Sequence, residues 1–487
     1  MPGGTLTVSG ALFLGLALAL ALGFEFVNGF HDTANAVATV IYTRTLKPGA
    51  AVIWSGIWNL IGVLSSSGAV AFAVVALLPV ELVLNVGTGT GFAMVFALLI
   101  SSMIWNLGTW FLGLPASSSH TLIGSIMGVG LANSLLSPGH RFGEGVNWTS
   151  AGEVGASLLI SPIVGFCGAA LLLFLLKRRL RRPELYGTPD PMKPPPPWIR
   201  AVLMLTCTGV SFAHGSNDGQ KGMGLIMLIL IGILPGSYAL GPRADAAGRQ
   251  RIAASERSLD ALLQSRASGT AVSDANTELS NFLWTKGQAT ARTFAALASK
   301  NRSLRDQLSR AADVTDRRAL RTDIYLVVRA LAKLMRLGRF DEPGERRSVS
   351  RYKAELEGLV NFIPGWVKAA VAVALGLGTM IGWKRIVVTV GERIGKAHLS
   401  YAQGATAEVV AMGTIGAADW FGVPVSTTHV LSSGVAGSMA ANHSGLQMDT
   451  VRNLLLAWVL TLPVCVLLGA TMFAAGLYLC LHVLGLT

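Results

Sequence analysis

The chain has few charged residues for its length. Only 13% of its 487 residues are Asp, Glu, Lys or Arg, whereas 52% are hydrophobic. A soluble protein of this size carries far more charge than this. Apolar stretches long enough to cross about 30 Å of hydrocarbon recur at 8–27, 51–79, 91–112, 151–176, 365–382 and 453–482. The sequence therefore predicts an all-α polytopic membrane protein.

Several short motifs of other protein classes are also missing. The four cysteines (Cys167, Cys207, Cys465 and Cys480) lie singly in apolar segments, which argues against a disulfide framework or a metal knuckle. There is no Gly-x-x-x-x-Gly-Lys-Ser/Thr loop, so ATP is not the direct energy source unless a separate subunit supplies it. The His-Glu-x-x-His spacing of zinc hydrolases is absent as well. We expect no enzymatic activity and no permanently bound cofactor.

Most of the net charge of +13 lies in one segment. Residues 241–362 hold 22 Lys and Arg against 14 Asp and Glu, and their apolar positions recur at helical spacing,. We interpret this segment as a soluble helical insertion. A shorter basic, Pro-rich block at 177–200 follows an apolar stretch, and short basic loops of this kind face the cytoplasm. We expect the linker, and more weakly the insertion, to be cytoplasmic. Binding of nucleic acid or acidic lipid is the weaker interpretation.

The chain contains two pairs of matching motifs. "FVNGFHDTANAVATVI" (26–41) aligns with "FAHGSNDGQKGMGLIM" (212–227), and "LPASSSHTLIG" (114–124) resembles "VPVSTTHVLSS" (423–433). The alignment pairs Gly29 with Gly215, His31 with Asn217, Asp32 with Asp218, Asn35 with Lys221, Pro115 with Pro424, and His120 with His429. The order of the motifs is the same on both sides of the 177–200 linker.

The spacing of the motifs indicates an internal duplication. Asp32 precedes His120 by 88 residues, and Asp218 precedes His429 by 211; the difference nearly equals the 122 residues of 241–362. We therefore divide the chain into repeat 1 (1–176), a linker (177–200), repeat 2 (201–240 and 363–487) and the insertion (241–362). Such halves form inverted-topology repeats, whose binding sites lie at helix breaks near the midplane. We interpret each Pro–hydroxyl motif as the tip of a re-entrant hairpin.

The Pro–hydroxyl motifs suit a helix start that binds an anion. Proline fits the first helical turn, hydroxyls cap the exposed amides, and the free N–H groups attract negative charge. Two such ends could converge on one oxyanion, and phosphate offers enough acceptor oxygens. The candidate residues are Ser117, Ser118, Ser119, Ser426, Thr427 and Thr428. The alternative is that they only cap hairpins and pack helices.

Two acids near such a site require a compensating positive charge. Asp32 and Asp218 would lie at membrane depth, where an ionisable group is costly unless paired. A hard cation could bridge carboxylate and phosphate, with Asn35 as a further oxygen ligand. Lys221 replaces this ligand in the second half and can pair with Asp218. With Asp32, Asp218, Lys221 and hydrogen phosphate counted, the net charge of the site is −3. A divalent metal ion and a proton on a histidine would neutralise it. The histidines considered are His31, His214, His120 and His429. The alternative is a packing salt bridge.

The four motifs resemble the duplicated signatures of the inorganic phosphate transporter (Pit) family, and most of all its bacterial low-affinity permeases. They are "GFHDTANAVATVIYTRTLKP", "WNLGTWFLGLPASSSHTLIG", "GVSFAHGSNDGQKG" and "GVPVSTTHVLSSGVAG". The resemblance covers the membrane portion of the chain. It implies inverted repeats with broken helices, and alternating access of an elevator or rocking type, in a bacterial inner-membrane protein. We expect a homo-oligomer, with two and three protomers both open.

The resemblance also implies roles for individual residues. The hydroxyls of both Pro–hydroxyl motifs would line the phosphate and cation site together with Asp32, Asn35 and Asp218. Beyond the resemblance, we also expect Asn217 and Lys221 to bind phosphate and His31 to take part in cation coupling, and we expect a transported metal ion to contact Asp32 and Asp218. Family members coupled to sodium commonly have Asn where this chain has Lys221, so a second sodium site does not transfer directly.

The sequence thus predicts a secondary active transporter that imports inorganic phosphate as a metal–phosphate complex with H⁺. The alternative within transport is a Na⁺-coupled phosphate or sulfate symporter. Two other classes are weaker. One is an intramembrane metalloenzyme that uses His31, Asp32 and His120, and the other is a scaffold or receptor whose active part is the basic insertion.

Overall fold

The described part of the chain is helical. The structure is a computed structural model, and it describes residues 8–485 except 33, 79–87, 138–141, 144–145, 147, 191–192, 243–244, 285–287 and 310–316. Within these residues five helices are long and apolar enough to cross a membrane, or six if the bent pair Pro343–Val360 and Gly365–Met380 is one span. The only β-pairing among them is one isolated bridge between Gly395 and Leu446. The prediction of an all-helical polytopic protein is confirmed at this level.

Two sets of helices flank the linker. Before it come α1 (Val8–Asp32), α2 (Ala34–Tyr42), α3 (Pro48–Ser65), α4 (Ala69–Val75), α6 (Gly89–Phe111), α7 (Ser118–Leu136) and α8 (Trp148–Arg179). After it come α9 (Pro197–Ile233), α10 (Pro235–Tyr238), α16 (Gly365–Met380), α17 (Lys384–Val388), α18 (Tyr401–Trp420), α19 (Thr427–Ala441) and α20 (Met448–Tyr478). We call these two sets together the helix body.

Glycines let the helices of the body cross closely, and these crossings occur in pairs. A Cβ on Gly62 of α3 would meet the carbonyl oxygen of Phe212 on α9, and one on Gly378 of α16 would meet that of Phe26 on α1. Phe26 and Phe212 are partners in the sequence alignment. A Cβ on Gly128 of α7 would likewise meet a backbone carbonyl oxygen of α20, and one on Gly437 of α19 would meet a backbone carbonyl oxygen of α8. Small residues at such crossings allow close backbone approach, which drives helix association in membranes.

We expect Gly437→Ala to destabilise the protein. The added methyl would meet the backbone of Phe166 on α8, which cannot move as a flexible side chain can. The change should lower the melting temperature of the purified protein in detergent by several degrees, although Ala favours a helix over Gly by about 1 kcal/mol. Gly413→Ala on α18 is the matched control, because nothing lies within 4 Å of its Cβ position. Equal melting temperatures for the two variants would contradict close packing at Gly437.

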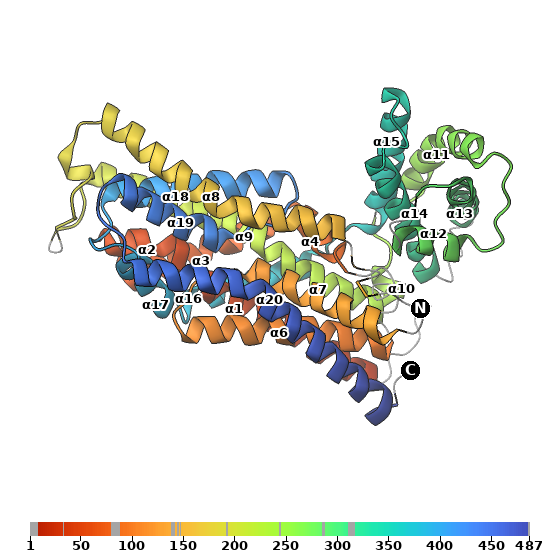
Figure 1. Cartoon of the computed structure of the whole chain (residues 1–487), viewed down its shortest axis with the longest axis horizontal. Coiled ribbons are helices and arrows are strands. Elements are labelled where there is room, and N and C mark those ends of the chain that lie inside the picture. The colour runs from red at the N-terminus through yellow and green to blue at the C-terminus, as the bar shows by residue number, and fades with distance from the viewer. Residues whose placement is uncertain are drawn as a thin grey trace.

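The insertion forms a separate group of helices at one end of the helix body (Figure 1). It contains α11 (Ala246–Ala267), α12 (Ala275–Trp284), α13 (Ala291–Ser309), α14 (Arg317–Arg336) and α15 (Pro343–Val360). These helices share a hydrophobic core of their own, in which Leu263, Leu331 and Tyr352 are buried. The tyrosine hydroxyl donates a hydrogen bond to Asn301 of α13. The helical periodicity of this segment is thus explained by packing within the insertion.

The linker and the insertion lie at opposite ends of the helix body (Figure 1). The helix α9 starts at the linker and ends next to the insertion, and its 37 residues are about 55 Å long at 1.5 Å per residue. Such a helix is long enough to cross a bilayer. We call these two ends the linker end and the insertion end. The cytoplasmic side predicted for the linker and the insertion stays a prediction.

Candidate functional site

The helices α6 and α18 end in the same way. Gly113 and Gly422 each follow the helix end by two residues and have positive φ angles of 68° and 66°. In each case the next residue's N–H, that of Leu114 or Val423, bonds back to the helix, at Thr109 O and Ala418 O. This left-handed turn is a common helix stop, and a proline shortly after it prevents the helix from continuing. It leads the chain into the Pro–hydroxyl motif.

The Pro–hydroxyl motifs start the next helices, as their residue types predict. Ser117 Oγ accepts a hydrogen bond from the His120 N–H at 3.3 Å, which caps α7. Ser426 Oγ accepts one from the His429 N–H at 3.2 Å, which caps α19. Each motif therefore presents the N-terminus of a buried helix, with the remaining hydroxyls in its first turn.

The turns that follow α6 and α18 lie at opposite ends of the helix body. Gly113 lies against α17 at the linker end, where its carbonyl accepts a bond from Thr389 Oγ1 at 2.7 Å. Gly422 lies against Ala69 of α4, which belongs to the insertion end. Between them the motifs extend into the middle of the body.

The two motifs meet at Asp32. This residue is the last one described in α1, and the described chain continues at Ala34 in α2. Ser118 Oγ, from the first motif, donates to Asp32 Oδ2 at 3.0 Å. Thr428 Oγ1, from the second motif, donates to Asp32 Oδ1. Asp32 is only 2% exposed, so hydroxyls from both halves of the chain share one buried carboxylate.

Asp218 lies next to this centre and pairs with Lys221. The Lys221 Nζ is 2.8 Å from Asp218 Oδ1, one helical turn away on α9. The same ammonium donates to Ser119 Oγ at 2.6 Å, and Ser119 donates to the carbonyl of Val425 at 2.9 Å. Ser118 Oγ lies 3.4 Å from Asp218 Oδ2. Both acids are therefore connected to the first motif.

His214 is the third member of a cluster that could hold a metal ion. Its Nε2 lies 3.8 Å from Asp32 and 3.5 Å from Asp218, and ligand atoms of these three buried residues lie within 4.8 Å of one another. The other ring nitrogen is 2.8 Å from Asn59 Oδ1, and the Asn59 amide donates to Thr379 Oγ1 at 3.1 Å. Two carboxylates and an imidazole form a donor set that fits a divalent metal ion.

Other predicted residues lie around this cluster. His31 Nε2 is 3.0 Å from Thr109 Oγ1, and its other nitrogen is 3.8 Å from Asp32. Asn217 donates to the carbonyl of Val423 at 3.3 Å, while Thr427 is buried at the first position of α19. The imidazoles of His120 and His429 pack against each other, with ring centroids 4.7 Å apart. Asn35 belongs to α2, but its side chain lies outside the described residues.

Residues 28–469 match the family of proteins described as the phosphate transporter family. This chain belongs to the phosphate transporter family. It is 40% identical to the low-affinity inorganic phosphate transporters PitB and PitA of Escherichia coli (strain K12), over 96% and 95% of this chain and 97% and 96% of theirs. A probable low-affinity inorganic phosphate transporter of Bacillus subtilis (strain 168) is 26% identical over 93% of this chain and 94% of its own.

The fold is also similar to that of a solved phosphate transporter. A structure titled "The sodium-dependent phosphate transporter" matches with a TM-score of 0.51 and 18% identity, and the match covers 95% of this chain and 98% of that one. The resemblance of the duplicated motifs to phosphate transporters is thus confirmed, and the relatives are named transporters rather than enzymes. Such homologues, together with the apolar helices, indicate a multi-pass membrane protein.

Several buried polar residues of this member of the phosphate transporter family were not predicted from the sequence. Asn59 orients His214, and Glu408 is fully buried on α18, where Thr39 and Thr206 donate to it. Glu25 is also fully buried, with Asn28 Nδ2 3.5 Å away. Each interrupts an apolar segment, and an ionisable or amide residue inside a membrane span is a signal of function on its own.

Proposed function

We propose that this protein imports inorganic phosphate by secondary active transport and binds it between the starts of α7 and α19. The observation that carries this proposal is that Ser118 and Thr428, from opposite halves, both donate to Asp32. Helix N-termini and hydroxyls supply the donors that phosphate oxygens accept. Phosphate transport by relatives at 40% identity supports the choice of anion.

The proposed route uses alternating access of two inverted repeats. In this proposal each Pro–hydroxyl motif is the tip of a re-entrant hairpin. The first hairpin, which includes Gly113, would enter from the linker end, and the second, which includes Gly422, from the insertion end. The hydroxyls at their meeting point are buried, with Ser118 and Thr428 each 1% exposed. In this proposal one hairpin at a time moves aside, so that the site opens to one end and then to the other.

The proposed orientation places the linker end in the cytoplasm. Of the 17 Lys and Arg residues outside the insertion, 14 belong to segments at that end: the turn between α2 and α3, the linker 177–200, the segment 384–396 that contains α17, and the start of α20. Short loops rich in Lys and Arg remain inside. In this proposal the insertion lies on the outer side, which differs from the expectation that it is cytoplasmic. The charge rule binds such a long segment only weakly.

The proposed coupling is with a divalent metal bound to phosphate and with H⁺. Asp32, His214 and Asp218 could hold the metal next to the anion. Lys221 already occupies one oxygen of Asp218, which leaves less room for a second Na⁺ at that carboxylate. Coupling to Na⁺ is the alternative, because the solved structure of similar fold is titled as sodium-dependent.

Uptake into proteoliposomes tests the proposal. We expect labelled phosphate to enter when an inward proton gradient and Mg²⁺ are both supplied, and uptake to fall by at least tenfold when a protonophore collapses the gradient. An inward Na⁺ gradient alone should produce no uptake above that of protein-free vesicles. Uptake driven by Na⁺ without a proton gradient would establish the alternative coupling, and no phosphate uptake under any gradient would contradict the proposed function.

A further inference from the structure

A cavity of about 650 Å³ lies between the insertion and the helix body. One wall comes from α14 and α15, and the other from α4, the end of α9, and Phe421 and Gly422 of the second hairpin. Gly422 is four residues before Ser426, the residue that caps α19. The cavity therefore lies at the insertion end of the path toward the proposed phosphate site.

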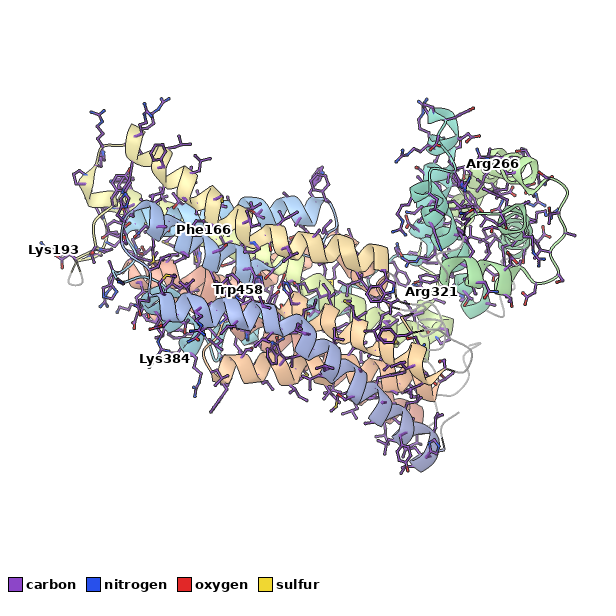
Figure 2. All side chains as sticks on the ribbon, in the orientation of Figure 1. Phe166, Lys193, Arg266, Arg321, Lys384 and Trp458 are labelled. Atoms are coloured by element: carbon purple, nitrogen blue, oxygen red, sulfur yellow. The ribbon has the colours of Figure 1, made fainter. Side chains whose placement is uncertain are left out.

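Basic residues of the insertion line this cavity. They are Arg321 and Arg329 of α14 and Lys353 of α15; Figure 2 labels Arg321 at the junction between the insertion and the helix body. One acid, Glu357, lines it as well and lies 2.8 Å from Lys353 Nζ. Burial lowers the pKa of Arg321 to about 10, so its guanidinium keeps its charge at neutral pH. The lining thus carries a net charge of +2.

The two arginines are held by backbone carbonyls and retain further donors. Arg321 Nη1 donates to the carbonyls of Ala239 and Val360, each at 2.8 Å. Arg329 Nη2 donates to the carbonyl of Ala76, after α4, at 2.9 Å. A guanidinium has five N–H groups, so both arginines can bind an anion while they anchor the insertion.

A similar cavity lies at the linker end of the helix body. Its volume is about 640 Å³, and it is lined by Gly113 of the first hairpin and by Lys384, Arg385 and Arg393. Each hairpin end therefore borders a cavity that has three basic residues. At the linker end these residues belong to the helix body, whereas at the insertion end all three belong to the insertion.

We propose that the insertion forms an anion vestibule that collects hydrogen phosphate at the outer mouth of the transporter. This proposal rests on the proposed function and orientation. A cleft lined by charge of one sign concentrates ions of the opposite sign and speeds their association. The helix body has few basic residues at this end, and the insertion supplies them. The carboxylate of Asp419, between the cavity and the site, accepts hydrogen bonds from Ser216 Oγ at 2.7 Å and from Gln220 Nε2 at 2.6 Å.

Cysteine reactivity tests the vestibule without any transport. Thr322→Cys places a thiol in the cavity lining, in a Cys167→Ser background that removes the one exposed native cysteine. We measure the ratio of the reaction rates of an anionic and a cationic methanethiosulfonate. We expect this ratio to be several-fold higher for the introduced thiol than for a small thiol in solution. Inorganic phosphate should slow the anionic reagent, and the preference should disappear in Arg329→Gln/Lys353→Gln. Arg346→Gln/Arg351→Gln is the control, because both residues are exposed on α15 outside the lining.

Uptake kinetics give a second readout. We expect Arg329→Gln/Lys353→Gln to raise the KM for phosphate about fivefold at low ionic strength with little change in the maximal rate, and salt to reduce the difference. Glu357→Gln removes the opposing charge and should lower the KM, which tests the vestibule even if the double variant folds poorly. Equal reactivity of both reagents in a protein that transports normally would overturn the vestibule alone. A preference for the anionic reagent in a protein that transports no phosphate would support the vestibule and contradict the proposed function.

Discussion

Phosphate uptake should be lost when Asp32 is replaced by Asn, while the protein still folds. The Asp32 carboxylate accepts hydrogen bonds from Ser118 and Thr428 and lies 3.8 Å from His214. Its negative charge attracts the cation that accompanies phosphate, and an interaction with a charged partner is worth roughly 1.5–3 kcal/mol. A loss of about 3 kcal/mol is on the order of 100-fold in affinity. We therefore expect the initial rate of uptake to fall by at least that factor.

Asn has the size of Asp, so its effect on packing is small. The melting temperature of Asp32→Asn in detergent should fall by no more than a few degrees, because the amide oxygen still accepts one of the two hydroxyl hydrogen bonds. Asp449→Asn makes the same chemical change at an exposed position in the first turn of α20, and it should leave uptake unaltered. Uptake by Asp32→Asn within twofold of the unaltered protein would remove Asp32 from the site.

The duplicated motifs were sufficient to predict which residues meet. Asp32 and Asp218 each stand three residues after a glycine, and the Pro–hydroxyl motifs carry their own helix-start signal, so residue types alone indicated helix N-termini beside two acids. The structure places Ser118, Thr428 and Asp32 within hydrogen-bonding distance. Their roles in binding phosphate stay predictions.

The parts that were not predicted depend on contacts between distant segments. Asn59 has no motif around it, and its contact with His214 spans 155 residues, so sequence spacing could not indicate it. Asn217 was expected at the phosphate site; on the continuous helix α9 its amide donates to the carbonyl of Val423, at the start of the second motif, and its role in binding stays a prediction. The side of the membrane on which the insertion lies stays a prediction.

The largest change in coupling should come from Lys221→Asn. This substitution gives the second half the residue type found at Asn35 in the first. It removes the ammonium 2.8 Å from Asp218, and removal of one partner of a buried ion pair costs roughly 3–5 kcal/mol. The remaining carboxylate then needs another cation. We expect uptake without Na⁺ to fall by at least tenfold, and added Na⁺ to restore part of it, because a carboxylate and an amide oxygen suit a hard cation.

A double substitution separates the loss of charge balance from the loss of folding. Asp218→Asn/Lys221→Met removes both charges, so it leaves no unpaired ion in the helix body and should recover most of the melting temperature lost in Lys221→Asn. It should not recover uptake, since the acid near the proposed metal position is gone. If Lys221→Asn keeps the same dependence of uptake on Na⁺, pH and Mg²⁺ as the unaltered protein, Lys221 does not act as a fixed cation in coupling. Lys221 would then serve only to pair Asp218 and to hold Ser119 in place.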